Sequence, residues 1–555
     1  MKAFPIKELL TLLLLSVSLF FSSINSLPVL DRDEARFAQA TKQMIEQNNY
    51  FSIKFQNEYR SKKPPGIYWL QSISVNILSK IEELGDKSFH IINNSIWKYR
   101  IISAISCLLS ILLFFYMNKQ IFSKKIAFYS SIILSSNILF IAEAHIAKTD
   151  ATLLFCTILV YLTLFNYFLG IKEKKQTINF ILLWGGLSLS ILIKGPILLI
   201  LVILTVLTIS IKKKEIHWIL QSKPVLGILI VIISTTMWFS LLSPQEQYNF
   251  INESILHDFL GKVLRAQENH SAFIGFYSLS FFVFFFPYTI FIFPTIHYLK
   301  NQFKDRKIFF LVSWVLPCLI VMELVPTKLP HYILPIYPAI SILVGLTLVK
   351  YKESKVFFFT NYAYFGYLVY FIISNSLLFI LHKTLEVYSD AYKHYLIELL
   401  ILFVLNNVFV IFLIRRKIKL LFFFLIGYAT IFTLFLYLKI LPNLNKIWIS
   451  ENISNSLKME TEYDYNKKIS VLGYNEPSLI FELGTDTRVF YNIENFLSSY
   501  KEYDYLIIEK NYYINFIEIV NNTELSYIKI KKLEGFNAAK GKWIEIYILK
   551  KQKNR

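Results

Sequence analysis

Long apolar segments recur along most of the chain, and they constrain its fold more than any other feature. Each is close to the 20 residues that an α-helix needs to cross the hydrocarbon core of a bilayer. Hydrophobic residues make up 55% of the 555 residues and charged residues 17%, against roughly 25% charged in soluble domains. The composition excludes an ordinary soluble enzyme and a disordered protein, and it predicts an all-α polytopic membrane protein.

About thirteen segments are expected to span the membrane. They are 8–29, 99–117, 126–143, 151–170, 178–193, 195–211, 224–243, 272–296, 308–322, 332–349, 356–381, 396–414 and 420–440. The fifth and sixth are divided at Lys194-Gly195-Pro196, because proline halts a helix. The first segment also resembles the apolar part of a signal peptide, but it lacks a small-residue cleavage site. We therefore expect it to remain as a span.

The net charge of +20 is explained by membrane orientation. Lysine- and arginine-rich loops, such as 119–125, 212–214 and 415–419, alternate with loops that carry few cations. Cytoplasmic loops of membrane proteins carry the excess of Lys and Arg. This rule predicts a multi-pass protein with a cytoplasmic N-terminus and a C-terminal stretch on the opposite face. We expect no nucleic-acid partner.

Residues 1–440 are expected to form the membrane domain, which includes a long external first loop at 30–98. Within this loop, segment 33–47 has the apolar spacing of an amphipathic helix at a membrane surface. Segment 66–82 is marginal for a span. Counting it as one would invert every later loop, so we interpret it as re-entrant or interfacial.

Residues 441–555 differ in pattern from the membrane domain. Strand-like runs at 468–474 and 505–509 alternate with helical stretches at 477–483 and 512–520. A final pair of strands, Ser526–Leu533 and Lys542–Lys550, is typical of a hairpin. The pattern predicts a small soluble α/β domain.

Ionisable side chains gather on the predicted external face, where they mark candidate functional positions. Asp33-Glu34 follows the first span, Lys62-Lys63 lies in the first loop, and Asp150 and Lys328 adjoin later spans. Each also has a structural interpretation, as a helix cap for the acids or an interfacial anchor for the lysines. Acids near the middle of the spans are almost absent, which disfavours an ion-coupled transporter. The three cysteines lie in apolar runs, which fits neither a disulfide framework nor a zinc site.

Two first-loop motifs carry a family resemblance. Asp33-Glu34-Ala35-Arg36-Phe37-Ala38 and Lys63-Pro64-Pro65-Gly66-Ile67-Tyr68-Trp69-Leu70 resemble the first periplasmic loop of bacterial GT-C glycosyltransferases. The nearest groups are the 4-amino-4-deoxy-L-arabinose lipid A transferases and the protein O-mannosyltransferase superfamily. Thr149-Asp150 and the run from Lys328 to Pro335 resemble later family motifs. The resemblance implies a GT-C fold with a C-terminal periplasmic α/β domain.

The resemblance also implies an activity, in which a sugar moves from a polyprenyl-phosphate donor to lipid A or a related envelope glycolipid. The site would lie on the periplasmic face of the bacterial inner membrane. Asp33, Asp150 and Glu34 are the candidate catalytic residues. The candidates for substrate and phosphate binding are Lys63, Lys62, Arg36, Arg265, Lys328 and Tyr332. Relatives often carry a proposed metal-binding Glu where Lys62 stands, so the sequence leaves a divalent metal open.

Two other functions remain open at this point. The same fold could modify protein hydroxyl groups or another envelope glycan, because these enzymes share the motifs. The alternative that is not an enzyme is a flippase or transporter for lipid-linked sugars. This alternative predicts that Asp33 and Lys63 are dispensable.

Overall fold

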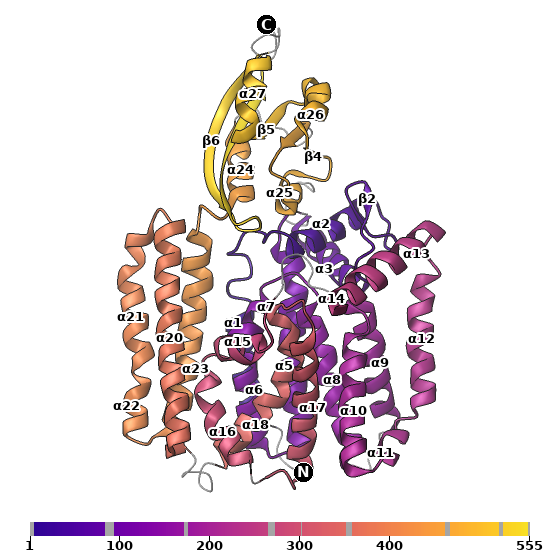
Figure 1. Ribbon diagram of the computed structural model, residues 1–555, viewed down its shortest axis with the longest axis vertical. Helices are drawn as coiled ribbons and strands as arrows, with labels where there is room; N and C mark the ends of the chain where they lie inside the picture. The colour runs from indigo at the N-terminus through magenta and orange to yellow at the C-terminus, as the bar shows by residue number, and fades with distance from the viewer. Residues whose placement is uncertain are drawn as a thin grey trace.

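The computed structural model describes residues 5–83, 94–170, 176–264, 272–300, 302–350, 358–460, 467–520 and 526–552. A helix bundle carries a separate sheet domain at one end, and the N-terminus lies at the opposite end (Figure 1). This arrangement has the predicted fold class, with a helical membrane domain and a small C-terminal α/β domain.

Helices account for nearly all of the bundle. Its first half contains α1 (Ile6–Phe20), α2 (Asp33–Glu46), α3 (Gly66–Glu83), α5 (Trp97–Ile121), α6 (Lys124–Ser135), α7 (Ile138–Ala144), α8 (Asp150–Leu169), α9 (Gln176–Lys194), α10 (Ile197–Lys213), α11 (His217–Leu220), α12 (Pro224–Phe239), α13 (Pro244–Phe250), the π-helix η1 (Ile251–Leu260) and α14 (Gly261–Leu264). Its second half contains α15 (Phe276–Phe284), η2 (Tyr288–Phe291), α16 (Ile292–Leu299), α17 (Arg306–Leu324), η3 (Pro330–Ile336), α18 (Tyr337–Val349), α20 (Asn361–Tyr388), η5 (Tyr392–Tyr395), α21 (Leu396–Asn407), α22 (Phe409–Ile414), α23 (Ile418–Phe435), η6 (Leu436–Ile440) and η7 (Leu441–Asn443).

Each of the thirteen predicted spans contains a helix, but the count of thirteen membrane crossings is not confirmed. Among the described residues, eight helices are long and apolar enough to cross a membrane, or up to ten if each of two bent pairs is one span. The bends are 65° between α6 and α7, and 115° between α15 and the segment from η2 to α16. Helices α1, α10 and α12, with 15, 17 and 16 residues, are shorter than an 18-residue span.

The bundle core is built from aromatic and aliphatic side chains on adjacent helices. Helix α8 packs between α5 and α9, and its Tyr161 stacks on Trp314 of α17 with ring centroids 4.0 Å apart. Gly195, with a φ of +77°, ends α9, and Pro196 precedes α10 as its N-cap. This break leaves Lys194 as the last residue of α9, at the end of the bundle that faces the sheet domain.

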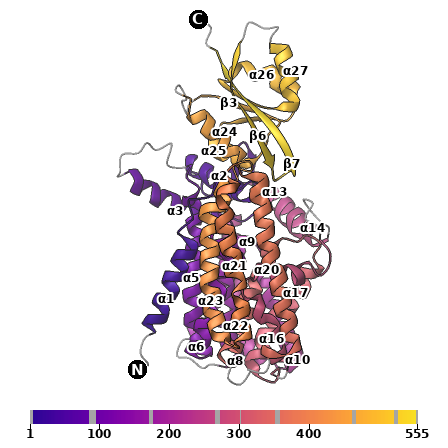
Figure 2. The ribbon, with the colours of Figure 1, turned by 90° about the vertical axis from the view of Figure 1, so that its left-hand side faces the viewer.

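The first loop forms two helices and a hairpin at the same end. Helix α2 packs against α3, and Thr41 of α2 donates a hydrogen bond to Gln71 of α3 at 2.8 Å. In Figure 2, α3 lies near α2 and projects to one side, at the end of the bundle that carries the sheet domain. Helix α3 is not among the helices that qualify as spans, in agreement with the interfacial interpretation. Strands β1 (Lys54–Phe55) and β2 (Glu58–Tyr59) form a short antiparallel hairpin.

The C-terminal domain is a five-stranded mixed sheet with helices on both faces. It contains α24 (Ile449–Lys458), β3 (Ile469–Leu472), α25 (Pro477–Leu483), β4 (Arg488–Phe490), α26 (Ile493–Ser499), η8 (Tyr500–Glu502), β5 (Tyr505–Glu509), α27 (Lys510–Val520), β6 (Tyr527–Asn537) and β7 (Lys542–Lys551). The strand order is β4-β3-β5-β7-β6. Strand β3 is parallel to β4 and β5, while β7 is antiparallel to β5 and β6.

Alternate residues of the central strands face two separate cores, as the two-residue period of a strand requires. Ile507 packs in the core that includes α24 and α25, whereas Leu506 and Ile508 pack in the core that includes Phe516 of α27. The predicted strands, the helix at 477–483 and the final hairpin are present. Strand β4 and helices α24 and α26 were not predicted.

Phe481 of α25 anchors the sheet domain to the bundle. Its ring packs edge-on against Tyr99 of α5, with centroids 5.4 Å apart, in a buried cluster with Ala35 and Ala38 of α2. The buried Lys42 of α2 donates a hydrogen bond to the Phe481 carbonyl at 3.3 Å. The first loop and the C-terminal domain therefore share a hydrophobic core.

Candidate functional site

A charged cavity of about 280 Å³ lies where the first loop meets the ends of several bundle helices. Its lining residues are Asp31, Arg32, Asp33, Arg36, Phe37, Arg60, Lys62, Lys63, Lys148, Thr149, Asp150, Lys194, Asp258, Lys262, Thr327, Leu329, His331 and Tyr332. Eight of these are Lys or Arg and four are Asp. The excess of positive charge suits an anionic ligand such as a phosphate group.

The structure brings six of the nine sequence-predicted site residues together in this cavity. Those six are Asp33, Arg36, Lys62, Lys63, Asp150 and Tyr332. Glu34 and Lys328 do not line it. Arg265 lies outside the described residues. The six come from positions as far apart as 33 and 332, so folding assembles a cluster that the separate motifs only suggest.

Helix α2 separates the two neighbouring acids of the first motif. It begins at Asp33, after Arg32, which has a positive φ of 64°. Consecutive residues of an α-helix point about 100° apart. As a result Asp33 is exposed towards the cavity, while Glu34 is fully buried towards the bundle.

Glu34 forms a buried ion pair with Arg100 of α5. The Arg100 guanidinium donates to both carboxylate oxygens at 2.8 Å, and both side chains are completely buried. Glu34 also accepts hydrogen bonds from the backbone N–H groups of Leu30 at 2.9 Å and Ala147 at 2.8 Å. These contacts hold the carboxylate in the protein interior, away from the cavity, and join the first loop to α5. They favour a structural role for Glu34 over the predicted catalytic one.

The contacts of Lys328 likewise favour a structural role over the predicted one in phosphate binding. Its ammonium group donates to the carbonyl oxygens of Glu323 at 2.7 Å and Val325 at 2.8 Å. The residue is 5% exposed. Carbonyl groups at a helix C-terminus lack partners within the helix, and cations there also interact favourably with the helix dipole. Lys328 thus stabilises the end of α17.

Asp150 is held by cations at the start of α8. Lys194 at the end of α9 donates to its carboxylate at 2.5 Å, and His331 lies 3.8 Å from the same group. The Lys194 ammonium is also 5.2 Å from the centre of the Tyr332 ring. These contacts place Asp150, Lys194 and Tyr332 in one connected group on the cavity wall.

Lys148 extends the same group. It forms ion pairs with Glu143 at 3.0 Å and with Asp150 at 3.9 Å. Burial disfavours the charged form of Lys148, but the carboxylates of Glu143 and Asp150 outweigh that effect and raise the pKa of its ammonium above the usual range. Lys148 therefore keeps its positive charge at the cavity.

Lys63 also lines the cavity, where it contacts Asp258 of the π-helix η1. Its ammonium donates to Asp258 at 2.7 Å, and Lys262 lies 2.6 Å from the other oxygen of the same carboxylate. Burial lowers the pKa of Lys63, and the Asp258 carboxylate counters that shift. Despite its burial, Asp258 has a lowered pKa because Lys63 and Lys262 stabilise its charge.

Sequence reasoning did not select Lys194, Lys148, Asp258, Lys262 or Arg60 as site residues, although all five line the cavity. A signal for Lys194 was its place before Gly195-Pro196, at the external end of a predicted span. The other four stand in loops or irregular helices, and their sequence positions do not show which of them converge.

The carboxylates of the cavity do not form a typical metal site. Among the described residues, no group of three or more His, Cys, Asp and Glu side chains has a geometry suited to holding a metal ion. Asp150 and Asp258 each form ion pairs with lysines, whose positive charge opposes the binding of a cation at the same carboxylates. Within the described part of the chain, this donor set offers no typical place for a divalent metal.

Comparisons with known proteins agree with this arrangement. Residues 62–239 match the family described as dolichyl-phosphate-mannose-protein mannosyltransferase. An uncharacterized protein of Aquifex aeolicus is 26% identical over 63% of this chain and 66% of its own length. An undecaprenyl phosphate-alpha-4-amino-4-deoxy-L-arabinose arabinosyl transferase of Wigglesworthia glossinidia brevipalpis is 25% identical over 62% of this chain and 59% of its own length. Both alignments thus span less than two thirds of the relative.

The fold extends the similarity to nearly the whole chain. The crystal structure of ArnT from Cupriavidus metallidurans bound to undecaprenyl phosphate matches with a TM-score of 0.75 and 15% identity, over 98% of both chains. The family match covers the first-loop lysine motif and the segment from α5 to α12. Taken together, these similarities show that the chain has the fold of the ArnT structure and that parts of it are similar in sequence to arabinosyl transferases and to the protein mannosyltransferase family.

Proposed function

We propose that the protein transfers a sugar from a polyprenyl-phosphate donor to lipid A or a related envelope glycolipid, at the charged cavity. The observation that carries the proposal is the convergence of Asp33 with eight Lys and Arg side chains in one cavity of about 280 Å³. A transferase of this kind needs cations for the phosphate and a carboxylate near the acceptor. Support for the donor class comes from the structural relative bound to undecaprenyl phosphate.

The cations of the cavity would bind the donor phosphate and stabilise its departure. When the bond between the sugar C1 and the phosphate oxygen breaks, the oxygen keeps the electron pair and negative charge grows on the phosphate. Preorganised positive groups stabilise such charge most when it develops in the transition state. Lys63 and Lys194 are the main candidates, because Asp258 and Asp150 hold their ammonium groups at the cavity wall.

Asp33 would act on the acceptor. If the acceptor is a hydroxyl group, its oxygen forms the new bond to C1 and its proton passes to the Asp33 carboxylate. If the acceptor is itself a phosphate, no proton must be removed, and Asp33 would stabilise positive charge on the sugar instead. Its exposure at the first turn of α2 gives it access to a ligand, which the buried Glu34 lacks.

The proposed location is the periplasmic face of the bacterial inner membrane. The positive-inside pattern supports this orientation. The sheet domain and the first loop lie together at the end of the bundle opposite the N-terminus (Figure 1), so a cytoplasmic N-terminus would place both in the periplasm. A lipid-linked donor and a glycolipid acceptor would then reach the cavity from the same leaflet.

A second candidate is transfer to a protein hydroxyl group. The family match to protein mannosyltransferases over residues 62–239 favours it. The matched segment includes Lys63, Asp150 and Lys194, which would serve either acceptor.

The test is mass spectrometry of lipid A and of polyprenyl-phosphate sugars in cells that carry the native protein, no protein, Asp33→Asn or Lys63→Met. We expect both variants to lose the sugar from lipid A and to accumulate the lipid-linked sugar, as in cells without the protein. Asp390→Asn is the matched control, because Asp390 is 67% exposed and lies outside the cavity. Accumulation of donor with unchanged lipid A would favour the second candidate. Full transfer by both variants would refute the proposal.

A further inference from the structure

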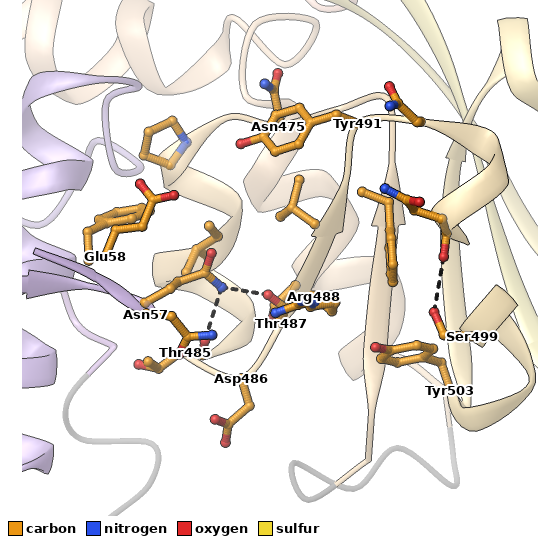
Figure 3. Close-up of a pocket in the computed structure, with 18 of the residues that line it drawn as sticks. Asn57, Glu58, Asn475, Thr485, Asp486, Thr487, Arg488, Tyr491, Ser499 and Tyr503 are labelled. Carbon is orange, nitrogen blue, oxygen red and sulfur yellow. Dashed lines mark hydrogen bonds between the residues drawn. The ribbon is translucent and has the colours of Figure 1, made fainter. Parts of the chain in front are cut away.

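A second and larger cavity, of about 890 Å³, lies between the sheet domain and the first-loop hairpin. Figure 3 shows Asn57 and Glu58 of the hairpin on one side, facing residues 485–491 of the sheet domain. Its volume falls in the range of roughly 300–1,000 Å³ that is typical of small-molecule sites. The proposed transfer reaction uses none of its lining residues.

The lining of this cavity combines polar and aromatic groups. Hydroxyl and amide side chains, among them Asn57, Asn475, Asn492 and Ser498, lie beside aromatic rings. One of these rings belongs to Tyr491, which is 69% exposed and extends from the loop after β4 (Figure 3). A large exposed aromatic ring beside many hydrogen-bonding groups is typical of a ligand site rather than of an interior.

From this composition we propose that the second cavity is a saccharide-binding site for neutral or amino sugars. Sugar hydroxyl groups both donate and accept hydrogen bonds, which amides and hydroxyl side chains match. The apolar C–H face of a sugar ring packs against an aromatic ring such as Tyr491. The charged lining residues are Glu58, Asp486, Glu502 and Arg488. This excess of carboxylates disfavours anionic sugars and is attractive to protonated amines.

The two walls of the cavity are held together before any ligand binds. The Gln56 side chain donates to the carbonyl oxygens of Thr485 at 3.1 Å and Thr487 at 2.6 Å. These bonds, drawn in Figure 3, also occupy backbone groups just before the edge strand β4.

The saccharide site adjoins the charged cavity through the first loop. Glu58 lines the larger cavity and Arg60 lines the charged one. Neighbouring Cα atoms are 3.8 Å apart, so these two Cα atoms are separated by less than roughly 8 Å. If the proposed transfer reaction is correct, the larger cavity would hold the glycan part of a substrate whose reacting group lies in the charged cavity. Sugar binding itself does not depend on that reaction.

The experiment measures binding of three disaccharides to the purified full-length protein in lipid nanodiscs, by saturation-transfer-difference NMR. The probes are chitobiose, the glucosamine disaccharide and digalacturonate. We expect the first two to bind and digalacturonate to bind at least 10-fold more weakly. Tyr491→Ala should lower the affinity for chitobiose and for the glucosamine disaccharide by 10-fold or more. Asp486→Asn should lower the affinity for the glucosamine disaccharide selectively. The matched control is Tyr248→Ala, because Tyr248 is 66% exposed outside the cavity.

The variant Asp33→Asn separates this inference from the proposed function, because it should lose transfer and keep sugar binding. Comparing the free disaccharides with alkyl glycosides of the same sugars in the nanodisc distinguishes a soluble glycan from a glycolipid headgroup. Equal binding of digalacturonate, or unchanged binding by Tyr491→Ala, would overturn the inference. Saturable binding of an extended Ser/Thr-rich peptide in place of the sugars would also overturn it.

Discussion

Replacing Glu34 by Gln tests whether this acid is structural, as its contacts indicate, or catalytic. The substitution keeps the shape of the side chain and removes its charge. Arg100 would then remain fully buried with three backbone carbonyl partners, those of Ile24, Leu27 and Pro28, and no anion. A buried charge that has lost its counter-ion destabilises a protein by about 3–5 kcal/mol.

The expected change in melting temperature follows from the size of the chain. An unfolding entropy of about 2.1 cal/mol/K per residue corresponds to roughly 1.2 kcal/mol/K if all 555 residues unfold together. A loss of 3–5 kcal/mol would then lower the midpoint by about 3–4 °C, and by more if the bundle unfolds separately. Glu34→Gln combined with Arg100→Met should recover part of the loss, because the double variant leaves no unpaired charge.

Thermal unfolding of the purified protein, monitored by intrinsic fluorescence, measures this shift in the midpoint. The transfer rate is measured separately, at temperatures below the midpoint. Glu34→Gln should unfold early and retain transfer at low temperature. Asp33→Asn should unfold normally and lack transfer. A Glu34→Gln variant with an unchanged midpoint and no transfer at any temperature would refute the structural assignment.

Three further predictions concern pH and packing. Burial raises the pKa of Asp31 from 3.8 to about 6. Protonated Asp31 therefore adds about 3 kcal/mol to the free energy of unfolding below pH 4, and this contribution is lost as the pH rises to 6. Asp31→Asn should flatten that decline of stability with pH, as measured by thermal unfolding. Asp258→Asn should shift the alkaline limb of the pH–activity profile to lower pH, because Lys63 loses the carboxylate that counters the lowering of its pKa by burial. Gly227→Ala should lower the melting temperature measurably, because the new Cβ would lie 1.9 Å from the ring of Trp184; Gly427→Ala, where nothing lies within 4 Å, is the control.

The sequence was sufficient to predict the fold class and the segments that become helices. Apolar runs and lysine-rich loops are local features of the sequence, so they can be identified without knowledge of tertiary contacts. The bends were not predicted, although Ser135-Ser136-Asn137 and Pro287 stand where the two segments turn, because each segment is long and apolar enough overall to be taken as one span. At the first bend, Asn137 caps α7 by accepting the N–H of Phe140.

The candidate site was predicted in part, and one physical cause explains why the sequence could not assign the remaining positions. Asp33 and Glu34 are adjacent acids in the sequence, and distant contacts, above all with Arg100, 66 residues away, hold Glu34 in the interior. Likewise, Lys194 meets Asp150 only because α8 and α9 pack side by side. The motifs identified residues that lie near the site, but tertiary contacts assign their roles.

The Phe481 anchor implies that the sheet domain is not an exchangeable module. Its ring and the side chains of Tyr99, Ala35 and Ala38 complete one buried cluster, so deleting the domain would expose an apolar patch on the first loop. A chimaera that takes its C-terminal domain from a relative should therefore fold only when it also takes that relative's first loop. Over evolution, the two regions would have to change together, although more than 380 residues separate Phe481 from Tyr99.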